Sequence, residues 1–277
     1  MAQLIHLRQR IKAIETIKKI THAMRLISMS THAQLKKRSP FVTAYTNAIN
    51  DLFKKLRASE KEKKEKHRIQ PKKDHLIILI GAQKGLCGNF NVYLFHFLFE
   101  HTEHQTVDLI VIGKKALEYA EHQRRPILKS ITNLSLRALN SLATELTEII
   151  LQELTTYARI SIISNSAKTF FQQTPRLQTL VPLPENNGHN HQLEDYHWEQ
   201  NKQELSEILL RTYIQAEVYH ALFQSLMAEQ AARFISMDSS TRNAKELLET
   251  TKLHYNKLRQ ANITKELTEL SSSFTQM

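Results

Sequence analysis

Glycine and proline, the residues at which a chain most readily turns, are confined to the middle of this sequence. The 277 residues contain five glycines and six prolines, whereas about 7% glycine is typical of globular proteins. Residues 1–39 and 189–277 contain neither residue type. Because long helices tolerate few such residues, we expect two long terminal helices on either side of a compact middle section.

The N-terminal segment has apolar residues at every third or fourth position, which is the spacing of one face of a helix. The spacing of this stripe departs from a strict heptad between Ile11 and Ile20, so we expect a partner helix that follows the stripe to be wound irregularly around it. Its members are Leu4, Leu7, Ile11, Ile14, Ile17, Ile20, Met24 and Ile27.

A longer stripe, with several polar or small members, runs through residues 202–270. As one continuous helix this segment would extend about 100 Å, whereas a compact chain of this length has a radius of gyration of about 19 Å. Such a helix needs cover outside a compact domain, and the N-terminal helix is the available partner. We therefore expect residues 1–58 and 201–277 to form an antiparallel two-helix coiled coil that projects from a central domain.

Three apolar runs in the middle of the chain have the composition of buried parallel strands. These runs cover residues 75–81, 107–113 and 159–164, and amphipathic stretches lie near residues 90–104, 114–123 and 136–156. Alternating strands and helices indicate an α/β fold with a mostly parallel sheet. We expect a Rossmann-like α/β domain over residues 75–200, with an edge strand within residues 177–183 and a charged linker over residues 59–74 before it.

The net charge of +11 is concentrated near the N-terminus. Residues 1–40 hold nine Lys or Arg and one acidic residue, and residues 41–74 hold ten and five, whereas the remainder is nearly balanced. A positive region indicates an acidic partner, which could be a nucleic acid, an anionic membrane or an acidic protein surface. Composition leaves all three open.

Three features of the middle section resemble functional sites but have simpler explanations. The loop at residues 81–88 lacks both glycine spacings that bind phosphate, so we expect a tight turn. Cys87 has no spaced His or acid and is expected to be a small buried residue, and a single cysteine excludes an internal disulfide. A polar cluster fits a loop better than a metal site. Its members are His189, His191, Glu194, Asp195 and His197.

Four motifs, in order along the chain, resemble the γ subunit of F-type ATP synthases. They are LRQRIK at residues 7–12 with KITHAM at 19–24, GLCGNFN at 85–91, LMAEQAARFISM at 226–237, and YNKLRQANITKELTEL at 255–270. The basic, acid-poor, amphipathic N-terminus could by itself be an organelle transit peptide. Because the resemblance starts at about Leu4, we expect a bacterial protein without a transit peptide. The sequence departs from the family's usual residues at Thr31, His32, Ala33, Lys84, Asn89, Ser273 and Phe274.

The resemblance implies a rotor shaft. Its coiled coil would sit inside the α3β3 hexamer, and its α/β domain would sit on the ε subunit and the membrane c-ring. ATP would be made or cleaved on the other subunits, so the chain would have no catalytic residues and no cofactor, and would not bind nucleic acid. It would lie at the cytoplasmic face of the bacterial inner membrane as a peripheral protein.

The resemblance also implies which residues contact partners. Met24 would face β, although ordinary coiled-coil packing explains that position equally well. Arg233 would join the polar contacts of the coil. A catalytic subunit would grip the C-terminal helix at the remaining positions. These are Arg259, Gln260, Thr264 and Glu266.

Two other functions are open on the residues themselves. A coiled-coil hairpin that binds nucleic acid through the basic N-terminal segment would show steeply salt-dependent binding. However, no aromatic residues are interleaved with the basic ones in the manner of single-strand binders. A nucleotide-binding enzyme using the loop at residues 81–88 would bind ATP in solution, which we do not expect.

Overall fold

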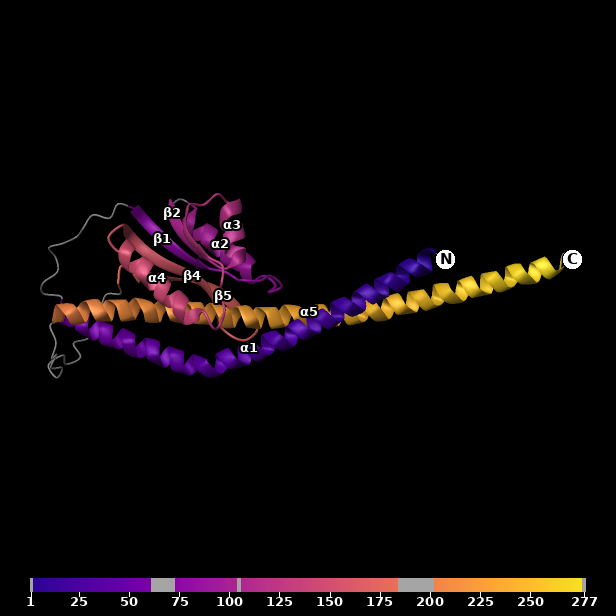
Figure 1. The fold of residues 1–277 in the computed structure, drawn as a ribbon, viewed down its shortest axis with the longest axis horizontal. Helices are drawn as coiled ribbons and strands as arrows, with labels where there is room; N and C mark the ends of the chain where they lie inside the picture. Colours follow the sequence, from indigo (N-terminus) through magenta and orange to yellow (C-terminus); the bar gives the residue numbers. More distant parts are fainter. Residues whose placement is uncertain (1, 61–72, 104–105, 184–201, 276–277) are drawn as a thin grey trace. The chain divides into compact units, whose positions relative to one another are not determined.

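The computed structural model describes residues 2–60, 73–103, 106–183 and 202–275. Two long helices, α1 (Ala2–Glu60) and α5 (Lys202–Thr275), begin and end the fold (Figure 1). Between them the chain forms β1 (Lys73–Ile80), α2 (Phe90–Thr102), β2 (Val107–Ile112), α3 (Lys114–His122), β3 (Ile127–Ile131), α4 (Leu139–Glu153), β4 (Tyr157–Ala167) and β5 (Gln173–Val181). The expected fold class, long terminal helices with an α/β section between them, is confirmed.

Two predictions fall wholly or largely outside the residues that the structure describes. These are the charged linker, of which residues 61–72 are not described, and the cluster of histidines and acids within residues 184–201.

The internal contacts divide the chain into two units that cut across both long helices. The first, here called the coiled-coil unit, consists of α1 through Ser28 and α5 from Phe234 onward. The second, here called the α/β unit, runs from Met29 to Arg233.

The sheet of the α/β unit has the strand order β3-β2-β1-β4-β5. The first four strands are parallel, and β5 pairs antiparallel with β4 at one edge. The expected strands correspond to β1, β2, β4 and the edge strand β5. The other edge strand, β3, was not expected, because Ile127–Ile131 is short and its three middle residues are exposed.

Both faces of the sheet are buried, which explains why the central strands read as continuous apolar runs. On β1, Leu76, Ile78 and Ile80 pack with α4 and the two long helices, whereas Ile77 and Leu79 pack with α2 and α3. Successive side chains of a strand point to opposite faces, so one run of residues serves both layers. Figure 1 shows α2 and α3 on one side of the sheet and α4 on the other.

Within the α/β unit, the two long helices pair antiparallel. The rings of Phe53 and Tyr213 stack with centroids 4.5 Å apart. One turn of α5 further on, Asn50 Nδ2 donates to Glu217 Oε1 at 2.6 Å. Numbering therefore falls along α1 as it rises along α5.

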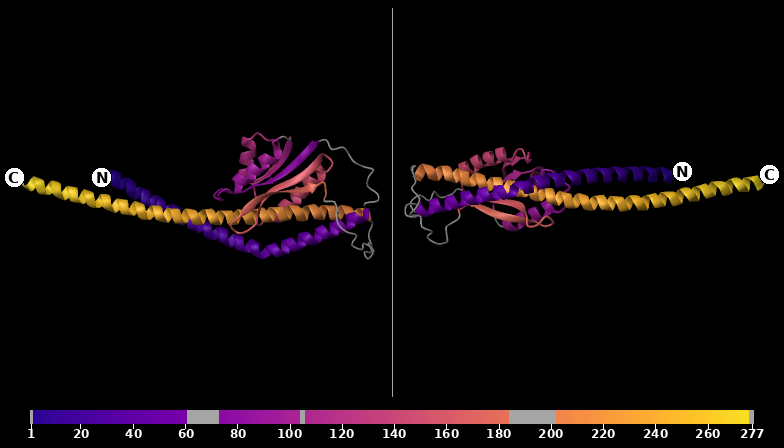
Figure 2. Two further views of the ribbon diagram at one scale, coloured as in Figure 1. Left: turned by 180° about the vertical axis from the view of Figure 1, so that it is seen from behind. Right: turned by 90° about the horizontal axis from the view of Figure 1, so that it is seen from below.

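The coiled-coil unit shows the same antiparallel pairing (Figures 1 and 2). Arg25 forms an ion pair with Asp238 at 2.7 Å, Thr241 Oγ1 donates to Thr21 Oγ1 at 3.0 Å, and Glu15 pairs with Lys252 at 2.7 Å. Ile14 packs with Ala244 and Leu248 to form its small apolar core. The predicted coiled coil of the chain ends is thus confirmed within this unit.

The predicted apolar stripe of α1 is wrong in its second half. We call the row of buried and half-buried positions along which α1 meets α5 the seam. Past Ile14 the seam continues through Lys18, Thr21, Arg25 and Ser28. In contrast, Ile17, Ile20 and Ile27 are 52%, 53% and 65% exposed. A coiled coil keeps a 3.5-residue period so that its seam stays facing the partner helix. The apolar stripe drifts away from that period, so small and polar residues occupy the seam instead.

Candidate partner-binding surface

The displaced isoleucines form an exposed apolar surface on α1. Ile17, Ile20, Met24 and Ile27 follow one another at helical spacing beside the seam, and we call them the α1 stripe. Met24, a predicted contact residue, is half-buried, whereas its three companions are more than half exposed. The structure therefore places Met24 at the edge of the seam, where it continues an apolar surface that is exposed among the residues the structure describes.

Four of the other predicted contact residues lie together near the end of α5. Arg259, Gln260, Thr264 and Glu266 are all exposed, and Thr264 Oγ1 donates to the carbonyl of Gln260 at 3.0 Å within the helix. Large apolar residues are exposed among them, and these were not expected from the sequence to be contact residues. They are Leu253, Ile263, Leu267 and Leu270, and with the four polar residues they make up what we call the α5 end surface.

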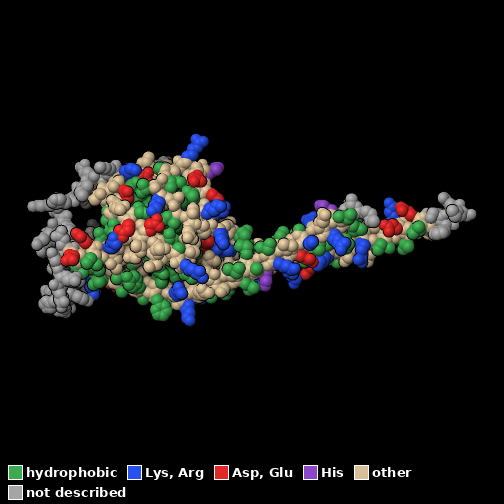
Figure 3. All heavy atoms as spheres, viewed as in Figure 1, with side chains coloured by type: hydrophobic (Ala, Val, Ile, Leu, Met, Phe, Trp, Pro, Cys, Tyr) green, Lys and Arg blue, Asp and Glu red, His purple; other side chains and the backbone are tan. Residues whose placement is uncertain are grey.

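Helical spacing alone could have identified this mixed surface. Gln260, Ile263, Thr264 and Leu267 are separated by three, one and three residues, so they lie on one face of α5. Figure 3 shows hydrophobic and basic side chains at the surface of the coiled-coil unit. Such a surface combines apolar contact area with donors and charges that can orient a partner.

Arg233 has a different environment from the other five predicted contact residues. It is buried, and its guanidinium pairs with the Glu229 carboxylate one turn earlier on α5. It also donates to the main-chain carbonyl of Lys84 at 3.2 Å and to that of Gly85 at 3.4 Å. The structure thus gives Arg233 contacts within its own chain, at the loop between β1 and α2.

That loop, residues 81–89, is the tight strand-to-helix turn expected from the sequence. Leu86 and Gly88 have positive φ values of 63° and 56°, which reverse the chain sharply. The Asn91 side chain accepts from the Ala82 N–H at 3.0 Å and donates to Cys87 Sγ at 3.4 Å. The Asn91 side chain of α2 thus holds the loop to the helix that follows it.

Cys87 is a small buried residue, as predicted. It is 3% exposed and packs with Ala228 and Ala232 of α5. Burial raises the pKa of its thiol, and the nearby Glu229 carboxylate raises it further. Since the thiolate is the reactive form, this environment does not suit a nucleophile.

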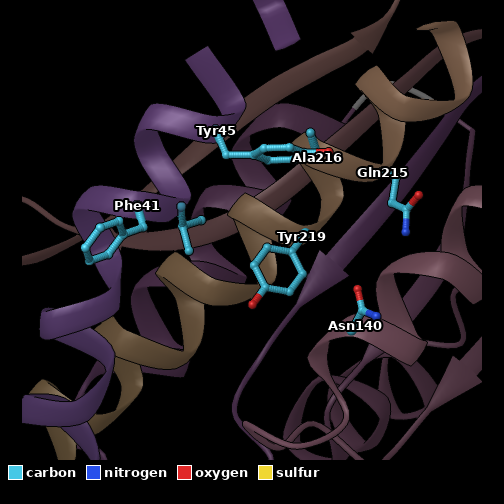
Figure 4. Close-up of a pocket in the computed structure, with 7 residues that line it drawn as sticks. Phe41, Tyr45, Asn140, Gln215, Ala216 and Tyr219 are labelled. Atoms are coloured by element: carbon cyan, nitrogen blue, oxygen red, sulfur yellow. The ribbon is translucent and has the colours of Figure 1, made fainter. Parts of the chain in front are cut away.

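A hollow of about 380 Å³ lies between α1, α4 and α5 of the α/β unit (Figure 4). The rings of Tyr45 and Tyr219 border it, and the amides of Asn140 and Gln215 point toward one another at its other side. Its lining is mostly apolar, and this hollow was not expected from the sequence. The remaining lining residues are Phe41, Val42 and Ala216.

A polar cluster joins the starts of three strands. Asp108 accepts hydrogen bonds from Lys73 Nζ at 2.6 Å and from the Tyr157 hydroxyl at 2.5 Å. Burial and the Asp108 carboxylate raise the pKa of Tyr157 to about 12, so the phenol stays protonated. The cluster ties strands together and holds no activated nucleophile.

Within the described ranges, no group of three or more His, Cys, Asp or Glu side chains is placed to hold a metal ion. None of the helices in those ranges combines the length and hydropathy needed to cross a membrane.

Comparisons with known proteins agree with the motifs. A family model described as ATP synthase matches residues 3–276. The ATP synthase gamma chain of Buchnera aphidicola subsp. Baizongia pistaciae is 32% identical over 285 residues, covering 96% of this chain and 95% of the relative. That of Helicobacter pylori strain Shi470 is 31% identical over 296 residues, covering 98% of each chain.

Solved structures share the fold. A chain of the Euglena gracilis mitochondrial ATP synthase, in the OSCP/F1/c-ring structure in rotational state 3, has a TM-score of 0.71 at 15% identity. The match covers 100% of this chain and 95% of that one. With the family model spanning nearly every residue and gamma chains more than 30% identical over almost their full length, this chain belongs to the ATP synthase family, as one of its gamma chains.

Proposed function

We propose that this chain is the central stalk subunit of an F-type ATP synthase, which transmits torque between the membrane c-ring and the catalytic α3β3 hexamer. The observation that carries the proposal is the exposed apolar surface of the coiled-coil unit among the described residues, because exposed apolar patches of large side chains mark sites where a partner binds. Ile27, Leu253 and Leu267 are each more than 60% exposed. Burial of such side chains in a surrounding cavity would be favourable by roughly 25 cal/mol per Å².

The positive charge of the coiled-coil unit would complement acidic residues on the wall of the α3β3 cavity. Residues 1–28 hold six Lys or Arg and one acidic residue. Opposite charge on the partner would speed assembly and fix register, whereas the apolar residues would supply contact area. The polar seam and the sparse apolar contacts would limit adhesion to any one position in the cavity and so permit rotation.

The partners are proposed from the family and from the solved relatives. The related Euglena and Tetrahymena chains come from rotor and central stalk/c-ring structures of ATP synthases. We infer that the coiled-coil unit binds α and β subunits and that the α/β unit binds the ε subunit and the c-ring. The chain would then be peripheral to the membrane, at the cytoplasmic face of a bacterial inner membrane, and ATP chemistry would occur on the other subunits. The chain itself would be non-catalytic.

The proposed contact residues lie mainly on the α1 stripe and on the α5 end surface. The α1 stripe, including Met24, would face a β subunit. The α5 end surface would be gripped by a catalytic subunit through Arg259, Gln260, Thr264 and Glu266. Arg233 would support the polar contacts of the coil from its buried position. A stalk surface that binds one conformation of the catalytic subunits better than another shifts the populations of those conformations as it turns.

The double variant Arg259→Ala/Gln260→Ala tests the grip on α5. Removal of contacts that distinguish conformations should lower the ATPase turnover of the assembled complex by about tenfold, equivalent to about 1.4 kcal/mol of differential binding. Steady-state hydrolysis by the purified complex is the measurement. His254→Ala/Lys265→Ala is the matched control, because these residues are exposed on another face of the same segment. Turnover equal to that of the control would refute the grip.

Assembly tests the broader proposal. A tagged chain should co-purify with α and β subunits in fixed ratio. The nucleic-acid alternative receives no support from the family assignment, and salt-dependent DNA or RNA binding without assembly would be required to revive it.

A further inference from the structure

The contact between α5 and the loop at residues 81–89 is more elaborate than a turn requires. Arg233 and Glu229 are 6% and 2% exposed, and both reach the loop backbone. Arg233 donates to the carbonyls of Lys84 and Gly85, while Glu229 accepts a hydrogen bond from the backbone of Gln83. Three consecutive loop residues are therefore bound to one turn of α5, and we call this contact the loop clasp.

The loop clasp lies at the end of the contact between the sheet domain and α5. Before it along α5, apolar residues from Leu209 to Leu226 pack against the sheet and α4. Arg233 is the last residue of the α/β unit on this helix. Because α5 is one continuous helix, a twist applied to it from residue 234 onward reaches the loop clasp before it reaches the apolar contact between Leu209 and Leu226.

The two kinds of contact resist twisting differently. Apolar burial is non-directional, so helices packed by it can slide or rotate at modest cost. Charge-assisted hydrogen bonds from a planar guanidinium are directional and are stronger in a buried site. The loop accepts them through main-chain carbonyls, and the Asn91 side chain and the buried Cys87 hold that loop to α2. The loop clasp thus joins α5 to the sheet through a defined geometry.

We propose that Glu229 and Arg233 are positioning residues that lock α5 to the β1–α2 loop, so that torque passes between α5 and the α/β unit without slipping. This inference rests on the proposed stalk function. On this proposal, Glu229 and Arg233 are important for coupling ATP hydrolysis to ion transport and not for hydrolysis itself. Hydrolysis occurs on other subunits and can proceed when the rotor slips.

Cys87 provides an internal reporter of the lock. It is the one cysteine of the sequence, and it lies within the loop, where it is 3% exposed and packs with Ala228 and Ala232 of α5. Separation of the loop from α5 would therefore expose its thiol to a reagent. The rate of Cys87 labelling by N-ethylmaleimide therefore measures opening of the loop clasp in the full chain, whether free or assembled.

The test compares Arg233→Met and Glu229→Gln with wild type. Met retains length and packing at the first site, and burial already raises the pKa of Glu229, so the carboxyl left behind can be neutral. We expect Cys87 labelling to rise about tenfold in the isolated full chain. We also expect the ratio of ATP-driven ion transport to ATP hydrolysis in the reconstituted complex to fall about twofold or more, with hydrolysis retained. Arg233→Lys should restore part of both, because it keeps the charge but not the fork of donors.

Two controls separate the loop clasp from general damage. Lys84→Ala removes a side chain but leaves its carbonyl acceptor, and Arg211→Met breaks an exposed ion pair with Glu148 on the same helix. Neither should change labelling or the transport ratio. Circular dichroism shows which variants are folded, and Glu229→Gln carries the test if Arg233→Met does not fold.

The outcomes are distinguishable. Unchanged labelling in a folded Arg233→Met or Glu229→Gln chain would overturn the lock itself. Increased labelling with an unchanged transport ratio would overturn its part in torque transfer. Failure of the wild-type chain to assemble with α and β subunits would overturn the stalk function instead, while the labelling result in the isolated chain still decides whether the lock exists.

Discussion

Gly113 occupies a position where the structure requires glycine, in a chain that contains few glycines. Its φ is +94°, and a Cβ at this position would lie 2.4 Å from the carbonyl oxygen of Gly81. The two glycines meet where β1 and β2 end and the chain leaves the sheet. A Cβ on Gly81 would lie 2.7 Å from that of Ala116 at the start of α3. At both positions the backbones of two segments approach closely. The sequence indicates this only by a glycine that follows a strand.

Gly113→Ala should therefore lower the free energy of unfolding by about 2–4 kcal/mol, because it adds both a strained φ and a backbone clash. Gly85→Ala is the matched control, since an added Cβ there meets nothing closer than Lys115 Cε at 3.8 Å. Urea unfolding of the full chain, followed by circular dichroism, is the measurement. Equal stabilities of the two variants would contradict the clash.

At the scale of elements, α1 illustrates the difference between an apolar stripe and a seam. Sequence periodicity located the helix and its partner correctly, and the seam through Ile14 agrees with it. Beyond Ile14 the geometry of a two-helix coil determined which side faces inward, and Thr21 and Ser28 became buried while Ile17 was left exposed. The edge strand β3 was missed for a related reason, because a strand with one well-covered end gives little apolar signal.

The position of the seam leads to different predictions for Ile14 and Ile17. Ile14→Ala should lower the stability of the isolated chain by about 2–3 kcal/mol, because it removes a buried side chain from the small core with Ala244 and Leu248. Ile17→Ala should change it by less than about 0.5 kcal/mol, since that side chain is 52% exposed. Chemical unfolding distinguishes them, and a larger loss from Ile17→Ala would show that the original stripe is the seam.

At the scale of the whole molecule, the absence of glycine and proline from most of both long helices suits a part that transmits torque. In the coiled-coil unit, α5 holds neither residue from Phe234 to its end. Glycine in a helix costs about 1 kcal/mol relative to alanine and introduces a flexible point. A stiff helix therefore follows from composition. The contacts of the buried Arg233 with the carbonyls of Lys84 and Gly85, which lie 149 and 148 residues away in the sequence, do not.

Two glycines introduced into α5 should reduce the coupling between the ends of the stalk. In Lys245→Gly/Glu249→Gly both sites are exposed, so packing is preserved, and stability should fall by about 2 kcal/mol relative to Lys245→Ala/Glu249→Ala. In the reconstituted complex the ratio of ATP-driven ion transport to hydrolysis should fall in the glycine variant and stay unchanged in the alanine variant. Equal ratios in the two would show that helix stiffness in this segment does not limit coupling.

The sequence by itself determined the long helices, their antiparallel pairing, the α/β section with its buried strands, and the family. Each of these is encoded in local composition, periodicity or a contiguous motif. Only the tertiary structure decided which residues face inward at the seam, that Arg233 is buried with Glu229 against the loop after β1, and that Gly113 meets Gly81. These features depend on how closely segments far apart in the chain approach one another. Such proximity produces no periodic pattern in the sequence.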